Sequence, residues 1–358
     1  MSYKQIGTAL ALAIVSSSAT ADPAGKIGSV DPAAFATNPL SLSDKLVAQP
    51  VLVPSSTPAD YANILQGDVG APVSLTAQLA LPEMAAAPYA AIIIVPGSGG
   101  VGPHHIVQMK MLVENGFAVL VIDPFTARGI SETISDQGRL PFSASAYDVL
   151  AATKFLRTRN DIDPKRIGVL GSSRGGTGAL MAAAKPISNA VLGEGAGIAS
   201  VVAGYPWCGA QFKSGALADE SQLLILQGDR DNWVSVQQCQ AAAQAARLTG
   251  SNVAIHLFHK AYHAFDREDV SPREIEAYTA LSFPIIYLDD DGTFINWRTD
   301  KPDPTIKGDF YSKYLVEGGF AQKGVTIGST GDQAKEYRKE ALDFFMATLG
   351  SQPTDESQ

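Results

Sequence analysis

Short apolar stretches without polar alternation recur along the middle of the chain, and segments with helical spacing separate them. Strands are predicted at residues 91–95, 117–122, 167–170, 199–204, 223–226 and 252–258. Helices are predicted at residues 105–114, 144–157, 174–184, 234–248 and 332–349. Strands that are apolar on both faces must be covered by helices on both sides, which is typical of a parallel sheet. The pattern predicts an α/β fold with a mostly parallel central sheet.

Three other regions depart from this alternation. Residues 73–81 alternate apolar and polar, which predicts a strand at the outer end of the sheet. Residues 22–70 have no clean period and are expected to form an irregular N-terminal extension. Residues 71–350 then form one domain, interrupted at about 267–323 by an insertion with a helical stretch at 274–281. An insertion of this length that starts at the rim of the predicted site is expected to form a wall or lid over the pocket. The alternative is that it packs on a remote face and only extends the core.

The first 21 residues have the three parts of a secretory signal peptide. Lys4 supplies positive charge, residues 6–15 are apolar, and Ala19-Thr20-Ala21 forms an A-x-A cleavage site. The apolar run is too short for a membrane anchor, which needs about 20 residues. We expect cleavage after Ala21, no membrane anchor, and a mature protein in the periplasm or outside the cell.

Composition and charge limit the classes of partner that the protein is expected to bind. The 358 residues carry a formal net charge of −9, and an acidic surface repels phosphate backbones, which argues against nucleic-acid binding. The chain has two cysteines, Cys208 and Cys239. In an exported protein this pair favours a disulfide, and two unrelated buried thiols are the alternative.

The strongest chemical motif follows the strand at 167–170. Gly171-Ser172-Ser173-Arg174-Gly175 has the G-x-S-x-G pattern, and a helix comes directly after it. In a strand–turn–helix context this pattern predicts a nucleophile elbow, in which the serine sits in a strained turn at the edge of the sheet. The flanking glycines let the neighbouring backbones approach closely. Ser173 is therefore the expected nucleophile.

A serine hydroxyl needs a base and an orienting acid, which follow in the order acid then histidine in this fold. Asp229 and Asp231 both lie after the strand at 223–226, and Asp231 is favoured because it is deeper in the loop. His263 is favoured as the base because it lies in a loop, over His259 at a strand end and His256 within the strand.

Five segments resemble the dienelactone hydrolase family. They are residues 95–100, 123–129, 171–176, 228–233 and 261–266. The resemblance covers roughly residues 75–266 and the closing helix. It implies the α/β-hydrolase fold, hydrolase activity and a Ser173–His263–Asp231 triad. The founding enzyme of the family uses a cysteine nucleophile, so Ser173 favours a broader hydrolysis of carboxylic esters in small molecules.

The glycine-rich loop at residues 97–102 has two interpretations. In a hydrolase, its Ser98 backbone N–H and that of Arg174 would form the oxyanion hole. The same loop also fits the G-x-G-x-x-G fingerprint, with Asp123 ending the next strand, which supports an NAD(P)-dependent oxidoreductase instead. The hydrolase interpretation is favoured because it also uses the downstream serine, aspartate and histidine. A catalytically silent binding protein on the same fold is a third hypothesis.

Two further clusters are not expected to bind metal, and no cofactor is predicted. His104 and His105 are adjacent and have no carboxylate at ligand spacing, so they are expected at the rim of the pocket or on the surface. Residues 289–292 are acidic but lack the ligand spacing of a calcium loop, and a hairpin turn between two apolar runs is expected there. The identity of the substrate is not predicted.

Overall fold

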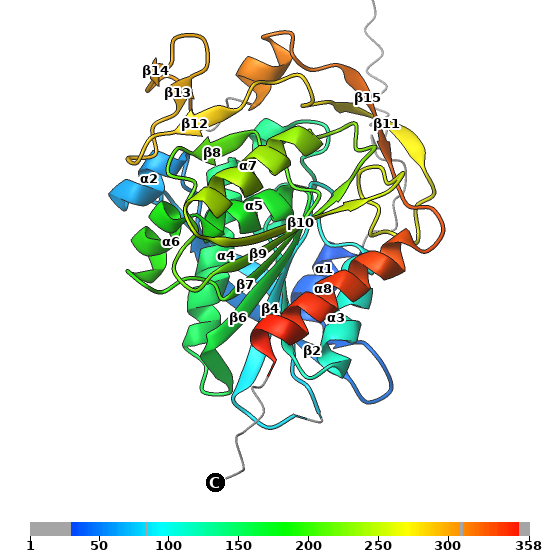
Figure 1. Ribbon diagram of the computed structural model, residues 1–358. Helices are drawn as coiled ribbons and strands as arrows, with labels where there is room; N and C mark the ends of the chain where they lie inside the picture. The colour runs from blue at the N-terminus through cyan, green and yellow to red at the C-terminus, as the bar shows by residue number, and fades with distance from the viewer. Residues whose placement is uncertain (1–29, 84, 308–310, 351–358) are drawn as a thin grey trace, which may run out of the picture.

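The computed structural model describes residues 30–83, 85–307 and 311–350, so the predicted signal peptide lies outside the described residues. A nine-stranded sheet forms the centre of the molecule (Figure 1). In spatial order its strands are β1 (Leu40–Ser41), β2 (Val47–Ser56), β3 (Pro72–Ala80), β5 (Ala118–Asp123), β4 (Tyr89–Val95), β6 (Ile162–Ser172), β7 (Ser200–Gly204), β9 (Gln222–Gly228) and β10 (Asn252–Phe258). Pairing is antiparallel from β1 to β5 and parallel from β5 to β10. The predicted mostly parallel α/β-hydrolase sheet is confirmed.

Helices cover both faces of this sheet. One face carries α4 (Phe142–Arg157), α5 (Arg174–Ala183), α6 (Lys185–Leu192) and α7 (Val236–Leu248), and the other carries α1 (Pro32–Thr37), α3 (Pro103–Glu114) and α8 (Gln333–Leu349). Within β4, Ile93 packs into the first core, while Ile92 and Ile94 pack into the second. Both sides of the strand are therefore buried, which explains its unbroken apolar sequence. Among the described residues, no helix is both long and apolar enough to cross a membrane.

Part of the expected N-terminal extension is regular structure. Strand β2 pairs with β3 along eight residues of each strand, and a short helix α2 (Tyr61–Gln66) follows it. Pro50 and Pro54 within β2 hid the strand from its sequence pattern. Only two residues of β1 pair with β2, so most of β2 lies at an edge of the sheet, where proline is tolerated.

A buried ion pair fixes this N-terminal segment to the domain. Arg128, in the 3-10 helix Thr126–Arg128, lies 2.8 Å from the Asp148 carboxylate in α4, and the Ser55 hydroxyl donates to the same group. Arg128 also donates to the Ser56 carbonyl and the Thr57 hydroxyl. Burial raises the pKa of Asp148 and the Arg128 guanidinium opposes that shift. The 123–129 segment therefore has a structural role.

The insertion also differs from the expectation. Residues 273–278 form strand β11 (Arg273–Tyr278), not a helix, and pair with β15 (Lys323–Ile327). The physical reason is a period of two: Ile275 and Ala277 are buried on one face, while Glu274 and Glu276 are exposed. This short sheet and its neighbours lie across one end of the central sheet (Figure 1).

The acidic turn of the insertion has the predicted local geometry. The Asp289 N–H donates to the Thr293 carbonyl, and Leu288 bridges Phe294 in antiparallel fashion. Strand β12 (Ile286–Leu288), however, pairs mainly in parallel with β8 (Ala210–Phe212), which binds the insertion to the domain. The insertion also contains β13 (Ile295–Asn296), β14 (Lys301–Pro302) and a π-helical turn, η3 (Tyr311–Val316).

Candidate active site

Ser173 sits at the junction of β6 and α5 in a strained backbone conformation. Its φ is 53° and its ψ is −116°, a combination that few residues other than glycine adopt. The neighbouring positions must be glycine because the surrounding backbone leaves no room for a Cβ atom. A Cβ on Gly171 would lie 2.2 Å from the Gly175 carbonyl oxygen, and one on Gly175 would lie 2.2 Å from the Val95 carbonyl oxygen. The motif therefore forms the sharp elbow that its sequence predicts.

The structure brings together the three residues that the sequence favoured. Ser173 Oγ lies 2.8 Å from His263 Nε2, and His263 Nδ1 lies 2.7 Å from Asp231 Oδ2. A carboxylate only accepts hydrogen bonds, so it fixes the proton on Nδ1 and leaves Nε2 to accept the serine proton. This arrangement can activate a hydroxyl for nucleophilic attack. The serine is partly accessible, while the side chains of His263 and Asp231 are buried.

The Asp231 carboxylate is held by four donors. One oxygen accepts the backbone N–H groups of Trp233 and Val234, and the other accepts Gln227 Nε2 and the imidazole N–H. Strand β9 ends at Gly228, so Gln227, Trp233 and Val234 belong to the strand end and the loop that follows it, while the imidazole comes from the loop beyond β10. These four hydrogen bonds prevent the carboxylate from rotating, so it holds the imidazole in one orientation.

The alternative acid and base lie elsewhere. Asp229 and His259 pair with each other at 2.9 Å, and the His259 side chain is 77% exposed. His256 is an exposed residue on β10 beside Glu340. Ser173 Oγ instead hydrogen-bonds His263, which leaves Asp231 and His263 as the candidates.

Aromatic rings enclose the imidazole of His263. The Tyr205 ring lies at a centroid distance of 4.7 Å and at 71° to the imidazole plane, and the Trp233 ring lies at 4.8 Å. The Tyr205 hydroxyl donates to Asp266 at 2.6 Å, and this fully buried carboxylate also accepts from Gln108 and Ser172. Burial and the Asp266 charge raise the pKa of Tyr205.

Tyr205 and Asp266 were not expected from the sequence to have a role at the site. Tyr205 directly follows β7, at the same end of the parallel sheet as the elbow, and Asp266 is three residues beyond His263. The sequence signal for Tyr205 was its place directly after a predicted strand, because functional groups gather at that edge of a parallel sheet. The bond between them depends on the approach of two loops 61 residues apart in sequence.

The glycine-rich loop lies beside the elbow. A Cβ on Gly97 would be 3.2 Å from Ser173 Cβ, so the loop backbone directly contacts the nucleophile residue. Ser98 follows in that loop, and Arg174 is the first residue of α5. Both side chains are buried. Their backbone N–H groups thus belong to the two segments that flank Ser173.

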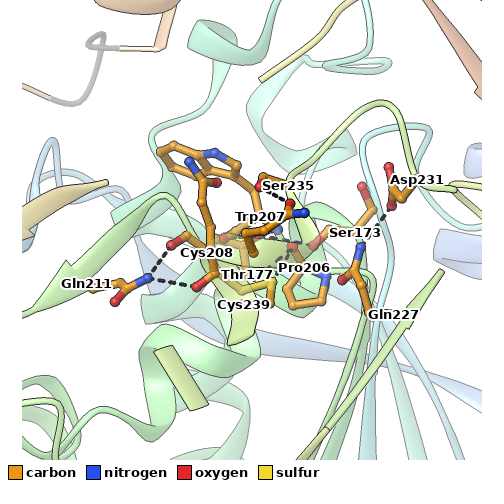
Figure 2. The surroundings of a disulfide bond; sticks show 12 residues. Ser173, Thr177, Pro206, Trp207, Cys208, Gln211, Gln227, Asp231, Ser235 and Cys239 are labelled. Atoms are coloured by element: carbon orange, nitrogen blue, oxygen red, sulfur yellow. Dashed lines mark hydrogen bonds between the residues drawn. A yellow bond between two sulfur atoms is a disulfide. The ribbon is translucent and has the colours of Figure 1, made fainter. Parts of the chain in front are cut away.

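The two cysteines are joined. Cys208 and Cys239 have an S–S distance of 2.10 Å and connect the loop after β7 to α7. Figure 2 shows this disulfide beside Pro206, with Ser173 and Asp231 on one side and Gln211 on the other. The Asp231 loop lies between the two cysteines in sequence, so the bond closes a loop that contains the candidate acid.

The histidine pair is buried rather than at the surface or the pocket rim. His104 and His105 are 8% and 1% exposed, and burial holds the pKa of both well below 6.5. His105 Nδ1 accepts the Gly102 N–H, so this histidine caps the start of α3. Within the described residues, no cluster of three or more metal-ligating side chains was found.

Asp123 does not have the freedom that the dinucleotide hypothesis requires. It is buried, and one of its carboxylate oxygens accepts the backbone N–H groups of Phe125 and Thr126. A ribose-binding acid must direct its oxygens toward the ligand. This carboxylate instead stabilises the turn after β5.

The insertion packs against the loops of the candidate triad. Gly328 donates its N–H to the His263 carbonyl, Thr326 donates to the Asn232 side chain, and Ala280 donates to the Trp233 carbonyl. A cleft of about 200 Å³ lies between the insertion and the segment preceding α4. The lining residues are Ile134, Ser135, Asp136, Gln137, Tyr278, Val316 and Glu317.

Sequence comparison identifies the family. The profile of the dienelactone hydrolase family matches residues 75–282, which is more than half of the chain. An uncharacterized peptidase of Bacillus subtilis, YuxL, is 25% identical over 216 residues. That match covers 51% of this chain and only 32% of the relative, so the chain spans about a third of that protein.

Solved structures with a similar backbone include two hydrolases. A dienelactone hydrolase from Anabaena variabilis is 20% identical, with a TM-score of 0.44 over 60% of this chain and 88% of that chain. The esterase Est2 from Thermogutta terrifontis, with propionate bound, is 18% identical, with a TM-score of 0.43 over 54% of this chain and 81% of that chain.

Proposed function

Because the chain belongs to the dienelactone hydrolase family, we propose that it is a serine hydrolase that cleaves carboxylic esters of small molecules through an acyl-enzyme. The observation that carries this proposal is the continuous hydrogen-bonded series from Ser173 Oγ through His263 to Asp231. Its nucleophile lies on a strained elbow, where the hydroxyl is partly accessible to a substrate. Each part has the geometry that general-base activation of a hydroxyl requires.

In the first half-reaction, Ser173 Oγ attacks the ester carbonyl carbon while His263 Nε2 takes the hydroxyl proton. The resulting imidazolium is stabilised by Asp231, which remains a carboxylate. The negative charge on the former carbonyl oxygen is held by the backbone N–H groups of Ser98 and Arg174. The tetrahedral intermediate then expels the alcohol, which receives the proton from His263, and leaves an acyl group on Ser173.

In the second half-reaction, a water molecule replaces the alcohol. His263 removes a proton from this water as it attacks the acyl carbon, and the second tetrahedral intermediate uses the same two backbone N–H groups. Its collapse releases the carboxylic acid and returns the proton to Ser173 Oγ. This route consumes one water and needs no cofactor.

The name of the Bacillus subtilis relative raises amide hydrolysis as a second activity. The same nucleophile can attack an ester or an amide carbonyl, and the leaving group distinguishes the two reactions. An alkoxide leaves more easily than an amide anion, so the ester reaction depends less on proton transfer from His263.

The test uses a fluorophosphonate probe together with panels of aryl esters and aminoacyl anilides. We expect stoichiometric labelling of Ser173 in the wild-type chain, no labelling of Ser173→Ala, and turnover of esters at least 100-fold faster than of anilides. Labelling without turnover would indicate an activated serine that acts on another class of substrate, whereas absence of both labelling and NAD(P) binding would favour a catalytically silent binding protein. Absence of labelling together with binding of NAD(P) would favour the oxidoreductase.

Export is part of this proposal. The predicted signal peptide precedes the described residues, and a disulfide such as Cys208–Cys239 persists in oxidising compartments. We expect the enzyme to act on esters in the periplasm or the medium. Mass spectrometry of protein from the source culture should find Asp22 as the first residue.

A further inference from the structure

The residues of the proposed oxyanion hole are joined by a side chain outside the triad. Gln137, in the 3-10 turn Gln137–Arg139, donates from Nε2 to Ser98 Oγ at 2.9 Å. Its Oε1 accepts from Arg174 at 2.7 Å. We propose that Gln137 is a positioning residue that holds the Ser98 and Arg174 backbones in register around the oxyanion. This inference rests on the proposed function.

The bonding pattern fixes the orientation of the Gln137 amide. A guanidinium has only donors, so Arg174 requires the oxygen of the amide and directs the NH₂ group to Ser98. Arg174 donates a further bond to the Gln137 backbone carbonyl at 2.6 Å, and to the Leu140 carbonyl at 2.8 Å. The guanidinium also lies 4.2 Å from the centre of the Phe142 ring.

Burial makes these bonds effective restraints. Gln137, Ser98 and Arg174 are 8%, 5% and 3% exposed, so water competes little for their polar groups. A second bond ties the same loop to the segment before Gln137, since the Thr133 N–H donates to the Ser98 carbonyl at 2.8 Å. The loop after β4 and the start of α5 are thus braced by one segment, residues 133–140.

The position of this brace matters because oxyanion stabilisation depends on preorganised donors. An N–H that is displaced from the developing charge loses most of its effect, and deleting one such donor in other serine hydrolases lowers kcat by roughly 10²–10³-fold. Gln137 acts through Ser98 and Arg174, so its loss should cost less than deletion of a donor. It also lines the cleft beside the insertion.

The test compares Gln137→Met with wild type, using a hydrolysed aryl ester and a trifluoromethyl ketone, which forms an oxyanion adduct with a serine. We expect kcat to fall roughly 10-fold, KM to change less than about threefold, and affinity for the ketone to fall in parallel with kcat. Activities are normalised to the fraction of folded protein, which is determined from the thermal unfolding transition. A kcat within twofold of wild type, or a lower kcat with full ketone affinity, would overturn the proposal.

The matched control is Gln78→Met. Gln78 is fully buried in β3 and donates to two backbone carbonyls, of Phe35 and Asn38, three strands away from β6 in the sheet. The Gln78→Met variant should be less stable than wild type but keep its kcat. A similar loss of kcat in both variants would overturn the specific role of Gln137.

If Gln137→Met fails to fold, Ser98→Ala decides. The alanine keeps the backbone N–H of residue 98 but removes the hydroxyl that bonds to Gln137, so we expect a low kcat, and wild-type kcat would overturn the proposal. Failure of the proposed function is recognised separately, since wild-type protein would then hydrolyse no ester.

Discussion

His259 lies 2.9 Å from Asp229 in an exposed pair, while His263 lies 2.7 Å from Asp231 in a buried one. Each pair joins a residue of the loop after β9 to a histidine beyond β10. The buried pair extends to a serine hydroxyl, since His263 Nε2 lies 2.8 Å from Ser173 Oγ. The exposed pair is therefore a natural internal control for the chemistry of the buried pair.

Replacing residues of the buried pair should lower kcat strongly, whereas replacing residues of the exposed pair should leave kcat nearly unchanged. We expect His263→Ala to lower kcat by about 10⁵–10⁶-fold and Asp231→Asn by about 10⁴-fold, because the three residues act as a unit. His259→Ala and Asp229→Asn should stay within twofold of wild type. Steady-state hydrolysis of an aryl ester measures all four, and an equal loss from His259→Ala would contradict the assignment.

Replacing the nucleophile should abolish turnover and leave the fold intact. Ser173→Ala should lower kcat by roughly 10⁶-fold. The variant should also be as stable as wild type or nearly so, since the serine side chain is partly accessible and alanine keeps the Cβ. Thermal unfolding and ester hydrolysis of the same preparation check both statements. Turnover near the wild-type rate would refute Ser173 as the nucleophile.

The disulfide should stabilise the region that holds Asp231. The bond links residues 31 apart, and removing such a bond costs about 2–4 kcal/mol of unfolding free energy. We expect the Cys208→Ala/Cys239→Ala double variant to unfold at a lower urea concentration than oxidised wild type, with its free energy of unfolding reduced by this amount, and reduced wild type to behave like the variant. Titration of the unfolded, unreduced chain should detect no free thiol; finding two thiols would refute the bond in solution.

The buried histidines should make the fold acid-sensitive. His104 and His105 have a lowered pKa in the folded state because of burial, and the Arg267 charge adds to this, while Asp266 opposes it at His105. Below pH 6.5 the unfolded chain binds protons that the folded chain does not. Stability is therefore full above this pH and falls as the pH decreases, by up to about 1.4 kcal/mol per pH unit for each histidine.

Urea unfolding between pH 7.5 and 5 measures this slope. His104→Gln should reduce the slope of unfolding free energy against pH by the equivalent of about one bound proton. His256→Gln, at an exposed position on β10, should leave this slope unchanged. An unchanged slope in His104→Gln would show that this histidine is protonated equally in both states.

The insertion should influence which ester is preferred. Tyr278 and Val316 contribute to the cleft opposite Ile134 and Gln137. We expect Tyr278→Ala to enlarge the cleft and shift kcat/KM toward longer acyl chains in a panel of aryl esters, with Ser173 still labelled by a fluorophosphonate. Tyr287→Ala, at an exposed position in β12, should keep the original order of preference. An unchanged order in both variants would place the insertion outside substrate recognition.

The sequence by itself determined the central strands, the helices between them and the elbow. The reason is local: a short, unbroken apolar run such as residues 91–95 favours a strand buried on both faces, and Gly171 and Gly175 are required by the close approach of neighbouring backbone at the elbow. Chain order and loop position then favoured Asp231 and His263 over their neighbours.

Tertiary structure decided what local pattern could not express. Strand β2 contains two prolines and exists because β3 pairs with it at the edge of the sheet, and β11 was mistaken for a helix because its period of two spans only six residues. The contact of Tyr205 with Asp266, and the bridge from Gln137 to Ser98 and Arg174, join segments far apart in sequence. Such contacts depend on how loops from different strands converge at one edge of the sheet, and a local pattern of residues does not contain that convergence.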